Sequence, residues 1–190
     1  KAFKRKDGSA IRFDDNAVVI LDEAYKGLSF RKMPRYENAI RLRSFSKEFN
    51  MEGWRLGYAI APKEIAAKLT AFNQISTTCT PAFVQRAGLA CLENEKEILD
   101  ANTKIWLERS LVAQSALKKA KFEFVKPDAG IYIFATHPKI NEKFAMKLLE
   151  NGVVVAPGNE FGCKNAIRIC VNQSEQILNR AIEMMKIASS

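Results

Sequence analysis

The sequence predicts an α/β protein in which a mostly parallel sheet precedes a smaller α/β domain, and three observations carry this prediction. Residues 17–21 form a continuous apolar, β-branched run, typical of a strand buried on both faces of a parallel sheet. Two further apolar runs, 39–43 and 56–61, flank an irregular loop. Strand-like and helix-like segments then alternate over residues 122–188, as expected for a compact α/β unit.

Turn and helix signals order the first half of the chain. Asp7-Gly8 predicts a turn within a polar, basic opening segment. Pro62 predicts the start of a helix, because proline is tolerated in the first helical turn. The polar run 76–81 ends this helix, and apolar residues spaced from Phe83 onward predict a second one.

A long amphipathic segment, residues 93–121, predicts a helix that links two lobes. We therefore place a domain boundary near residue 100, with residues 1–100 and 101–190 as the two domains. In the second domain, Asn151-Gly152 is a helix-stop signal. The predicted order there is strand, strand, helix, strand, strand, helix, at residues 122–125, 130–135, 141–151, 153–156, 166–171 and 174–188.

The composition is that of a soluble globular protein. Of the 190 residues, 47% are hydrophobic and 27% are charged, which supplies ample material for a core. No apolar run reaches the length that spans a bilayer, and no signal-peptide pattern opens the chain. The four cysteines lack metal-ligand spacing and there is one histidine, so we expect neither a metal site nor histidine catalysis. These features favour a cytoplasmic protein without membrane contact.

The formal charge of +9 raises the possibility of nucleic-acid binding. The basic residues are dispersed, however, with local clusters at residues 1–6 and 31–43. Aromatic residues do not interleave with them as a base-stacking platform would require. We therefore expect an ordinary basic surface that attracts anionic substrates, rather than a nucleic-acid interface.

The loop at residues 44–58 holds two side chains that could carry out chemistry, Lys47 and Arg55. The Lys47 amine can attack a carbonyl to form an imine, and the Arg55 guanidinium can hold a phosphate with a planar fork of donors. Pyridoxal phosphate needs both groups, because its ring carries an aldehyde and a phosphate. An isolated lysine or arginine is more often an exposed surface residue, so this interpretation needs support from other motifs.

A second candidate element follows the run at 17–21. Asp22 lies just past the predicted C-terminal end of that strand, at the edge where ligands bind in open α/β sheets. A carboxylate there can accept a hydrogen bond from a pyridinium N–H and keep the ring protonated. Tyr25 can present its phenol to the ring oxygen beside the aldehyde. The alternative is an aspartate that closes a strand, with a tyrosine packed against it.

Arg168 is the third candidate element, because it interrupts an otherwise apolar strand. An unpaired charge is costly to bury, so a guanidinium at this position suggests a carboxylate partner bound through two parallel hydrogen bonds. That partner is either a substrate or an acidic side chain. An edge-strand arginine with its head in water is the remaining alternative.

These motifs resemble the fold-type I pyridoxal-phosphate-dependent aminotransferases (class I/II). Ser-x-Ser-Lys at residues 44–47, followed by Arg-Leu-Gly-Tyr at 55–58, resembles the cofactor-lysine region of that family. Asp-x-Ala-Tyr-x-Gly at 22–27 resembles its ring-binding segment. Further segments resemble its small domain, although Ala129 stands where a glycine is common; they are residues 127–134, 154–162 and 167–170.

The resemblance implies transamination with pyridoxal 5'-phosphate as cofactor and a homodimeric assembly. Lys47 would hold the cofactor as a Schiff base and act as the catalytic base. Arg168 would bind the α-carboxylate of the amino-acid substrate, which exchanges its amino group with a 2-oxo acid. The cofactor-binding residues would be Asp22, Tyr25, Ser44, Ser46, Lys47 and Arg55.

Members of that family are considerably longer, and the resemblance covers only their C-terminal half. Residues 1–100 would then be the C-terminal part of a large cofactor-binding domain, and residues 101–190 the small domain. No glycine-rich turn that could cradle a phosphate appears before residue 17. We therefore expect a fragment that alone binds cofactor weakly or not at all and is inactive.

Two other functions fit the same residues. Another fold-type I enzyme, a decarboxylase or an acyl-transferring synthase, would share Lys47 and Asp22 and differ in its substrate groups. A non-catalytic, aminotransferase-like regulatory module would bind the cofactor without turnover. In the plainest alternative, the chain is an α/β domain whose lysine and arginine are surface residues.

Overall fold

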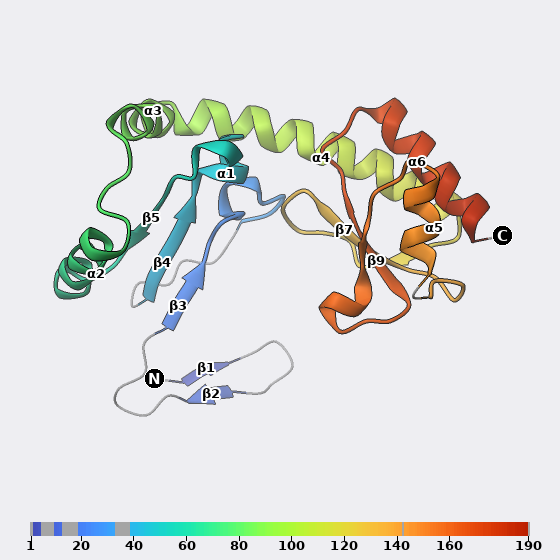
Figure 1. The fold of residues 1–190 in the computed structure, drawn as a ribbon, viewed down its shortest axis with the longest axis horizontal. Helices are drawn as coiled ribbons and strands as arrows, with labels where there is room; N and C mark the ends of the chain where they lie inside the picture. Colours follow the sequence, from blue (N-terminus) through green and yellow to red (C-terminus); the bar gives the residue numbers. More distant parts are fainter. Residues whose placement is uncertain (1, 5–9, 13–18, 33–38, 142, 190) are drawn as a thin grey trace.

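A computed structural model gives the fold of two α/β lobes joined by one long helix (Figure 1). The helix, α4 (Glu95–Lys119), runs along both lobes. The structure describes residues 2–4, 10–12, 19–32, 39–141 and 143–189.

The first lobe is built on a three-stranded sheet in the order β3-β4-β5. Strands β3 (Val19–Asp22) and β4 (Ala39–Ser44) are parallel, and β5 (Gly57–Ile60) is antiparallel to β4. The parallel pair places Asp22 and Ser44, the last residues of their strands, at the same edge of the sheet. The antiparallel strand begins at that edge, since its first residue pairs with Ser44.

Two helices of the first lobe begin directly after a proline, a start that the sequence predicts for Pro62 alone. Pro62 and Pro81 each stand directly before the first turn of a helix, with backbone φ of −53° in both. Of the polar run at 76–81, Ser76 is the last residue of the first helix, and residues 77–81 are not helical and separate the two helices. The helical segments are η1 (Lys26–Leu28), α1 (Phe45–Glu48), η2 (Glu52–Trp54), α2 (Lys63–Ser76) and α3 (Ala82–Glu93).

Charged side chains at both ends stabilise α4, the helix between the lobes. Acidic side chains occupy its first turn and lysines its last turn, which complements the helix dipole. Its buried residues Trp106, Ala113 and Leu117 belong to the hydrophobic core of the second lobe. The domain boundary near residue 100 thus falls inside this helix and stays a prediction.

The second lobe is a four-stranded antiparallel sheet in the order β6-β7-β9-β8, packed with two helices. Three of its six predicted segments agree closely with the structure, and the first, third and fourth are shorter than predicted. The elements are β6 (Glu123–Phe124), β7 (Tyr132–Thr136), α5 (Phe144–Glu150), β8 (Ala156–Pro157), η3 (Gly158–Phe161), β9 (Ala166–Cys170) and α6 (Glu175–Ala188).

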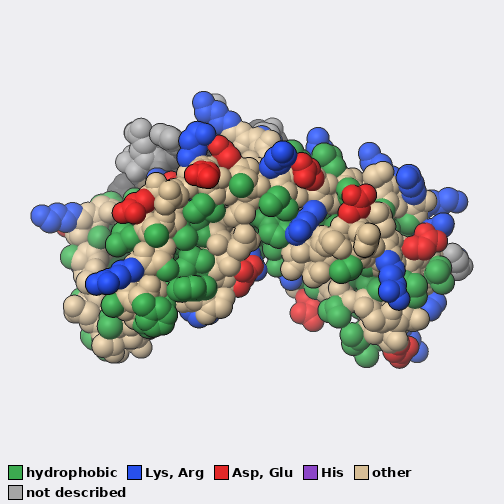
Figure 2. All heavy atoms as spheres, turned by 90° about the horizontal axis from the view of Figure 1, so that it is seen from above, with side chains coloured by type: hydrophobic (Ala, Val, Ile, Leu, Met, Phe, Trp, Pro, Cys, Tyr) green, Lys and Arg blue, Asp and Glu red, His purple; other side chains and the backbone are tan. Residues whose placement is uncertain are grey.

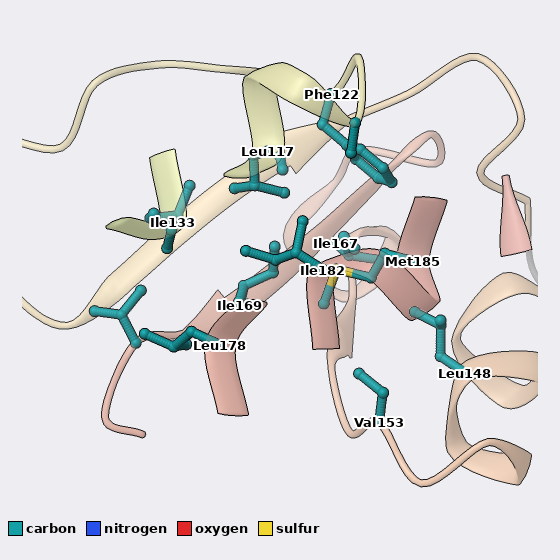
Figure 3. Close-up of a cluster of buried hydrophobic side chains, with 14 of the residues drawn as sticks. Leu117, Phe122, Ile133, Leu148, Val153, Ile167, Ile169, Leu178, Ile182 and Met185 are labelled. Carbon is teal, nitrogen blue, oxygen red and sulfur yellow. The ribbon is translucent and has the colours of Figure 1, made fainter. Parts of the chain in front are cut away.

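The main hydrophobic core lies in this second lobe, between its sheet and its helices. Leu117 of α4, Ile133 of β7, Ile169 of β9 and Ile182 of α6 are among the buried side chains that meet there (Figure 3). Leu28, which belongs to the first lobe, is fully buried in the same cluster. The turn after β3 is therefore anchored to the second lobe by apolar packing.

The structure corrects two predictions about strands. Ile20 in β3 is 60% exposed, so this strand is not buried on both faces; β3 is an edge strand in the described sheet. The strand predicted at 153–156 is also wrong apart from Ala156, because β8 contains only the two residues that pair with β9. The apolar β-branched run at 153–155 indicates a strand locally, but it has no partner in the described sheet.

The described part of the opening segment holds a feature that was not predicted. Strands β1 (Ala2–Lys4) and β2 (Ala10–Arg12) pair antiparallel. The turn predicted at Asp7-Gly8 lies outside the described residues, as do residues 17 and 18 of the first predicted strand. No helix in the described ranges combines the length and apolar character that crossing a bilayer requires.

Candidate active site

The predicted site residues of the first lobe gather at one edge of its sheet. Asp22 ends β3, and Ser44 ends the neighbouring parallel strand β4. Ser46 and Lys47 follow within α1, which begins directly after β4. Arg55 lies two residues before β5, which pairs with β4 from this edge. Pairing of the three strands thus explains why residues distant in sequence lie at a common edge.

A capped turn holds the lysine. The Ser44 hydroxyl accepts a hydrogen bond from the Ser46 N–H at 3.2 Å, which caps α1 and satisfies a free backbone donor. The Lys47 Nζ atom lies 3.3 Å from the Glu52 Oε1 atom, and the lysine side chain retains 26% exposure. Lys47 is therefore a partly exposed amine with a weak surface partner, which leaves it available to a bound molecule.

Arg55 is held in an unusual backbone conformation. Its φ of 55° and ψ of 44° are left-handed, a region that favours glycine. Its guanidinium donates to the backbone carbonyl of Glu52 at 2.8 Å, and the residue is exposed. Within the described residues no carboxylate forms an ion pair with it, so its remaining donors are available to an anion.

The turn after β3 presents Asp22 and Tyr25. The Asp22 carboxylate accepts the Ala24 N–H at 3.0 Å and is otherwise exposed. The Tyr25 ring stands edge-on to Tyr132 of β7, with centroids 6.2 Å apart. Burial, together with the neighbouring Tyr132 phenol, raises the pKa of Tyr25 to about 12. The phenol therefore stays protonated and can donate a hydrogen bond at neutral pH.

Glu23, between these two residues, is tied to the sheet. It forms ion pairs with Lys26 at 2.6 Å and with Arg41 of β4 at 2.9 Å. Burial alone would raise the pKa of the Glu23 carboxyl, but the hydrogen bonds from Lys26 and Arg41 hold it below its ordinary value. Glu23 thus fixes the turn, while the neighbouring carboxylate of Asp22 remains free.

Arg168 lies on the other lobe, in the centre of the second sheet. Its guanidinium carbon is 4.4 Å from the ring centroid of Tyr132 and 4.6 Å from that of Phe161. The guanidinium carbon thus lies over two aromatic rings, an arrangement that stabilises a half-buried cation. The described residues give it no ion pair with a carboxylate, so the partner that its sequence context suggests is not an acidic side chain of this part of the chain.

Contacts connect these groups into one region. Arg168 stacks on Tyr132, and Tyr132 packs against Tyr25, which follows Asp22 in the first lobe. Gly130, with φ of +80°, lies against the Tyr25 ring; a Cβ atom there would come within 3.3 Å of it. The lysine loop joins the same turn through Glu48, whose carboxylate accepts the Gly27 N–H.

Sequence reasoning missed three of the residues that shape this region. Tyr132 was recognised only as part of a motif, although it connects Arg168 with Tyr25. Glu48 and Arg43 form a buried ion pair at 2.7 Å beside Lys47. The signal for this pair was weak: Arg43 continues an alternating strand pattern, and a glutamate next to a loop lysine is normally solvated.

Comparison with known proteins identifies relatives of the whole chain. The family described as Aminotransferase class I and II matches residues 2–185. Aspartate aminotransferase of Thermococcus kodakarensis is 39% identical over 165 residues, which cover 84% of this chain and 45% of the relative. LL-diaminopimelate aminotransferase of Dehalococcoides mccartyi is 29% identical over 186 residues, covering 95% and 48%. The chain therefore spans about half the length of the curated relatives it matches.

Solved structures agree with the fold. A double mutant of Thermus thermophilus aspartate aminotransferase superposes with a TM-score of 0.82 at 26% identity, over 90% of this chain and 48% of that chain. The aromatic aminotransferase of Pyrococcus horikoshii superposes with a TM-score of 0.79 at 29% identity, over 90% and 50%. Both lobes and the long helix between them thus follow the arrangement of these enzymes.

Proposed function

The chain belongs to the class I and II aminotransferase family, and on that premise we propose that it serves amino-group transfer between an amino acid and a 2-oxo acid. The observation that carries the proposal is the gathering of Asp22, Ser44, Lys47 and Arg55 at one sheet edge. Because the chain spans about half of its curated relatives, the activity belongs to the whole protein in which these residues work.

Pyridoxal 5'-phosphate fits this donor set. The molecule carries an aldehyde, a ring nitrogen and a phosphate, and the edge offers an amine, a carboxylate and a guanidinium without an ion-pair partner in the described chain. Lys47 would hold the aldehyde end, Asp22 the ring nitrogen and Arg55 the phosphate, with the hydroxyls of Ser44 and Ser46 beside it. When bound, the cofactor supplies an electron sink for the bonds at the substrate α-carbon.

Each side chain then has a defined task. The Lys47 amine moves the proton at the substrate α-carbon, since it is a partly exposed base in a fixed turn. The Asp22 carboxylate keeps the ring nitrogen protonated by accepting its hydrogen bond. The Tyr25 phenol, protonated at neutral pH, donates to an oxygen on the ring. These tasks are electrostatic and orientational.

Arg168 supports the assignment of the substrate. A guanidinium in cation–π contact with Tyr132 and Phe161, without a described carboxylate partner, suits the planar carboxylate of an amino acid. These contacts restrict the side chain, so less entropy is lost when the carboxylate binds. The substrate would thus lie between the Lys47 amine of the first lobe and the Arg168 guanidinium of the second lobe.

We extend the proposal to the setting of the enzyme. We propose a homodimer in the cytoplasm, with residues 1–100 as part of a cofactor-binding domain and 101–190 as the small domain, and the two lobes of the structure support this division into domains. Aspartate and LL-diaminopimelate, from the names of the relatives, are the amino donors to test first.

An assay that follows both amino transfer and carbon dioxide release tests this function. The protein, with any part of it beyond these 190 residues, receives pyridoxal phosphate, an amino donor and 2-oxoglutarate. We expect amino transfer without carbon dioxide release, lost in Lys47→Ala and retained in Lys68→Ala, which changes an exposed lysine of α2. Carbon dioxide release in place of transfer, or full transfer by Lys47→Ala, would contradict the proposal.

A further inference from the structure

A buried ion pair lies directly beside the candidate catalytic lysine. The Glu48 side chain is fully buried, and its Oε2 atom accepts a hydrogen bond from Arg43 Nη2 at 2.7 Å. Arg43 is itself 9% exposed and also approaches Glu95, at the start of α4, at 3.3 Å. A fully buried carboxylate is costly unless it is paired, so a surface role does not account for Glu48.

The same carboxylate reaches the turn that carries Asp22 and Tyr25. Its Oε1 atom accepts the Gly27 N–H at 2.5 Å. Gly27 also lies close to two side chains: a Cβ atom there would lie 2.8 Å from Leu99 Cδ1 and 3.0 Å from Glu48 Oε1. A larger residue at this position would therefore require the Leu99 and Glu48 side chains to shift.

Two neighbouring residues of α4 hold the same two segments. Asn102 donates to the backbone carbonyl of Glu48 at 2.8 Å. Thr103 donates to the backbone carbonyl of Gly27 at 3.0 Å. Lys47 precedes Glu48 in the four-residue helix α1, so the lysine and the turn are fixed to each other and to the helix that continues into the second lobe.

We propose that Glu48 and Arg43 are positioning residues that set the Lys47 amine relative to the Asp22–Tyr25 turn. Glu48 does so by accepting from Gly27 and Arg43 at once, which fixes α1 against both the turn and strand β4. Neither residue touches substrate or cofactor in this scheme. The inference rests on the proposed function, since it concerns the geometry of the same site.

Burial raises the pKa of the Glu48 carboxyl, and the contacts with Arg43 and the Gly27 N–H oppose that rise. Besides Arg43 of β4, the negative charge of Glu95 in α4 acts on the Glu48 carboxyl and adds to the rise of its pKa. Arg43 provides the compensating charge, so its loss would leave the carboxylate unpaired in the interior.

The double variant Arg43→Met with Glu48→Leu separates positioning from stability. Replacing a buried ion pair by apolar residues of similar size is often neutral for stability, yet it removes the acceptor for Gly27. Two quantities are measured well below the unfolding midpoint, on the protein together with any part of it beyond these 190 residues. They are hydrogen exchange at the Gly27 amide, and the rate at which borohydride traps pyridoxal phosphate on Lys47, by peptide mapping. The control is Leu148→Ala, which opens a cavity in the second lobe's core.

We expect the double variant to keep its unfolding midpoint, to expose the Gly27 amide to exchange and to slow trapping on Lys47 by about tenfold to a hundredfold. Leu148→Ala should lower the midpoint and leave both local quantities unchanged. Glu48→Gln, which retains an acceptor for Gly27, should slow trapping less than the double variant. If the double variant fails to fold, the trapping rates of the other proteins decide the matter. The proposal then requires Glu48→Gln to trap pyridoxal phosphate on Lys47 more slowly than both wild type and Leu148→Ala.

The possible failures are distinguishable. Wild-type protein trapped at a lysine other than Lys47 would overturn the proposed function, and this inference with it. Wild-type trapping on Lys47, with trapping unchanged in the double variant and in Glu48→Gln, would overturn the positioning role alone. Trapping that follows the unfolding midpoint across all variants, Leu148→Ala included, would show that the pair is merely structural.

Discussion

At the scale of single residues, three groups have states that their neighbours determine. Tyr25 is protonated because of burial, Glu23 is ionised because of Lys26 and Arg41, and Arg168 is stacked between two rings. Several of these neighbours come from another element or lobe: Arg41 lies in β4, and Tyr132, beside Tyr25, lies in β7 of the second lobe. The protonation of Tyr25, the ionisation of Glu23 and the ring contacts of Arg168 therefore follow from the fold and cannot be read from the sequence alone.

The phenol of Tyr25 gives a pH-dependent prediction. Its pKa rises from 10.0 to about 12 on folding, so the folded state holds this proton more tightly than the unfolded state. The resulting stabilisation is complete below pH 10 and is lost as the pH rises through about 12. Tyr25→Phe should remove one late phenol ionisation from an absorbance titration, and its stability should fall less over this interval. Burial raises the pKa of Tyr58 as well, so the number of late ionisations is what is compared, and an unchanged number in Tyr25→Phe would contradict the assignment.

Arg168 gives a prediction about substrate binding. Arg168→Lys keeps the charge but loses the planar fork, whose charge-assisted hydrogen bonds contribute about 1.5–3 kcal/mol. We expect KM for the amino-acid substrate to rise about tenfold to a hundredfold. Turnover of an amine that lacks the carboxylate serves as the control and should not change. Equal losses for both substrates would mean that Arg168 does not bind the carboxylate.

At the scale of elements, the close approach of η3 to β9 requires a glycine at position 158. A Cβ atom at Gly158 would lie 2.4 Å from the backbone oxygen of Cys163 and 2.6 Å from that of Ala166. Backbone atoms cannot yield as a flexible side chain can, so Gly158→Ala should cost about 1–3 kcal/mol of unfolding free energy. Chemical denaturation measures this cost.

The matched control for that prediction is Gly53→Ala. No atom lies within 4 Å of a Cβ at Gly53, and its backbone is not left-handed. We expect a change within about 0.5 kcal/mol there, as for most surface substitutions. Equal losses at Gly53 and Gly158 would refute the steric explanation.

Helices were easier to predict than strands, for physical reasons. Pro62 acts locally, by fixing φ, so it marks the start of α2 without reference to the fold, and the spacing of apolar residues from Phe83 onward marks α3 in the same local way. A strand needs a partner, and Val154 shows the consequence: its run looks strand-like, yet it is 81% exposed and outside the ladder. The hairpin β1–β2 was missed because each strand has only three residues.

The residues of the candidate site also fall into two groups, those that the sequence predicts and those that only the structure reveals. Lys47, Asp22 and Arg55 were found because their chemistry and spacing form a family pattern. Glu48 and Tyr132 were not, since their importance depends on contacts made across 21 residues to Gly27 and across lobes to Tyr25. Such contacts leave no local trace in one sequence.

At the scale of the whole molecule, burial is uneven. The second lobe has a continuous core, whereas α2 contains no buried residue. Phe72 and Ile75 of α2 are 70% and 87% exposed, and Phe83 of α3 is 68% exposed. Hydrophobic side chains gather over this end of the molecule in Figure 2, the end occupied by α2 and α3 in Figure 1.

This unevenness predicts which helix opens first. A helix of 14 residues without a buried residue gains little from tertiary packing, so it should open locally at a low cost in free energy. We expect trypsin to cleave the 190-residue chain after Lys68 in α2 well before Lys104 in α4. Peptide mapping over a time course measures the order. Early cleavage in α4, with α2 intact, would mean that the apolar face of α2 is covered in solution.

The central claim is that Asp22, Lys47 and Arg55 hold one cofactor at the edge of the first sheet. A crystal structure of the protein with pyridoxal phosphate tests it most directly. The account predicts the aldehyde carbon at Lys47 Nζ, the ring nitrogen at the Asp22 carboxylate and the phosphate at Arg55. Cofactor bound at another lysine, or with its phosphate far from Arg55, would contradict the account.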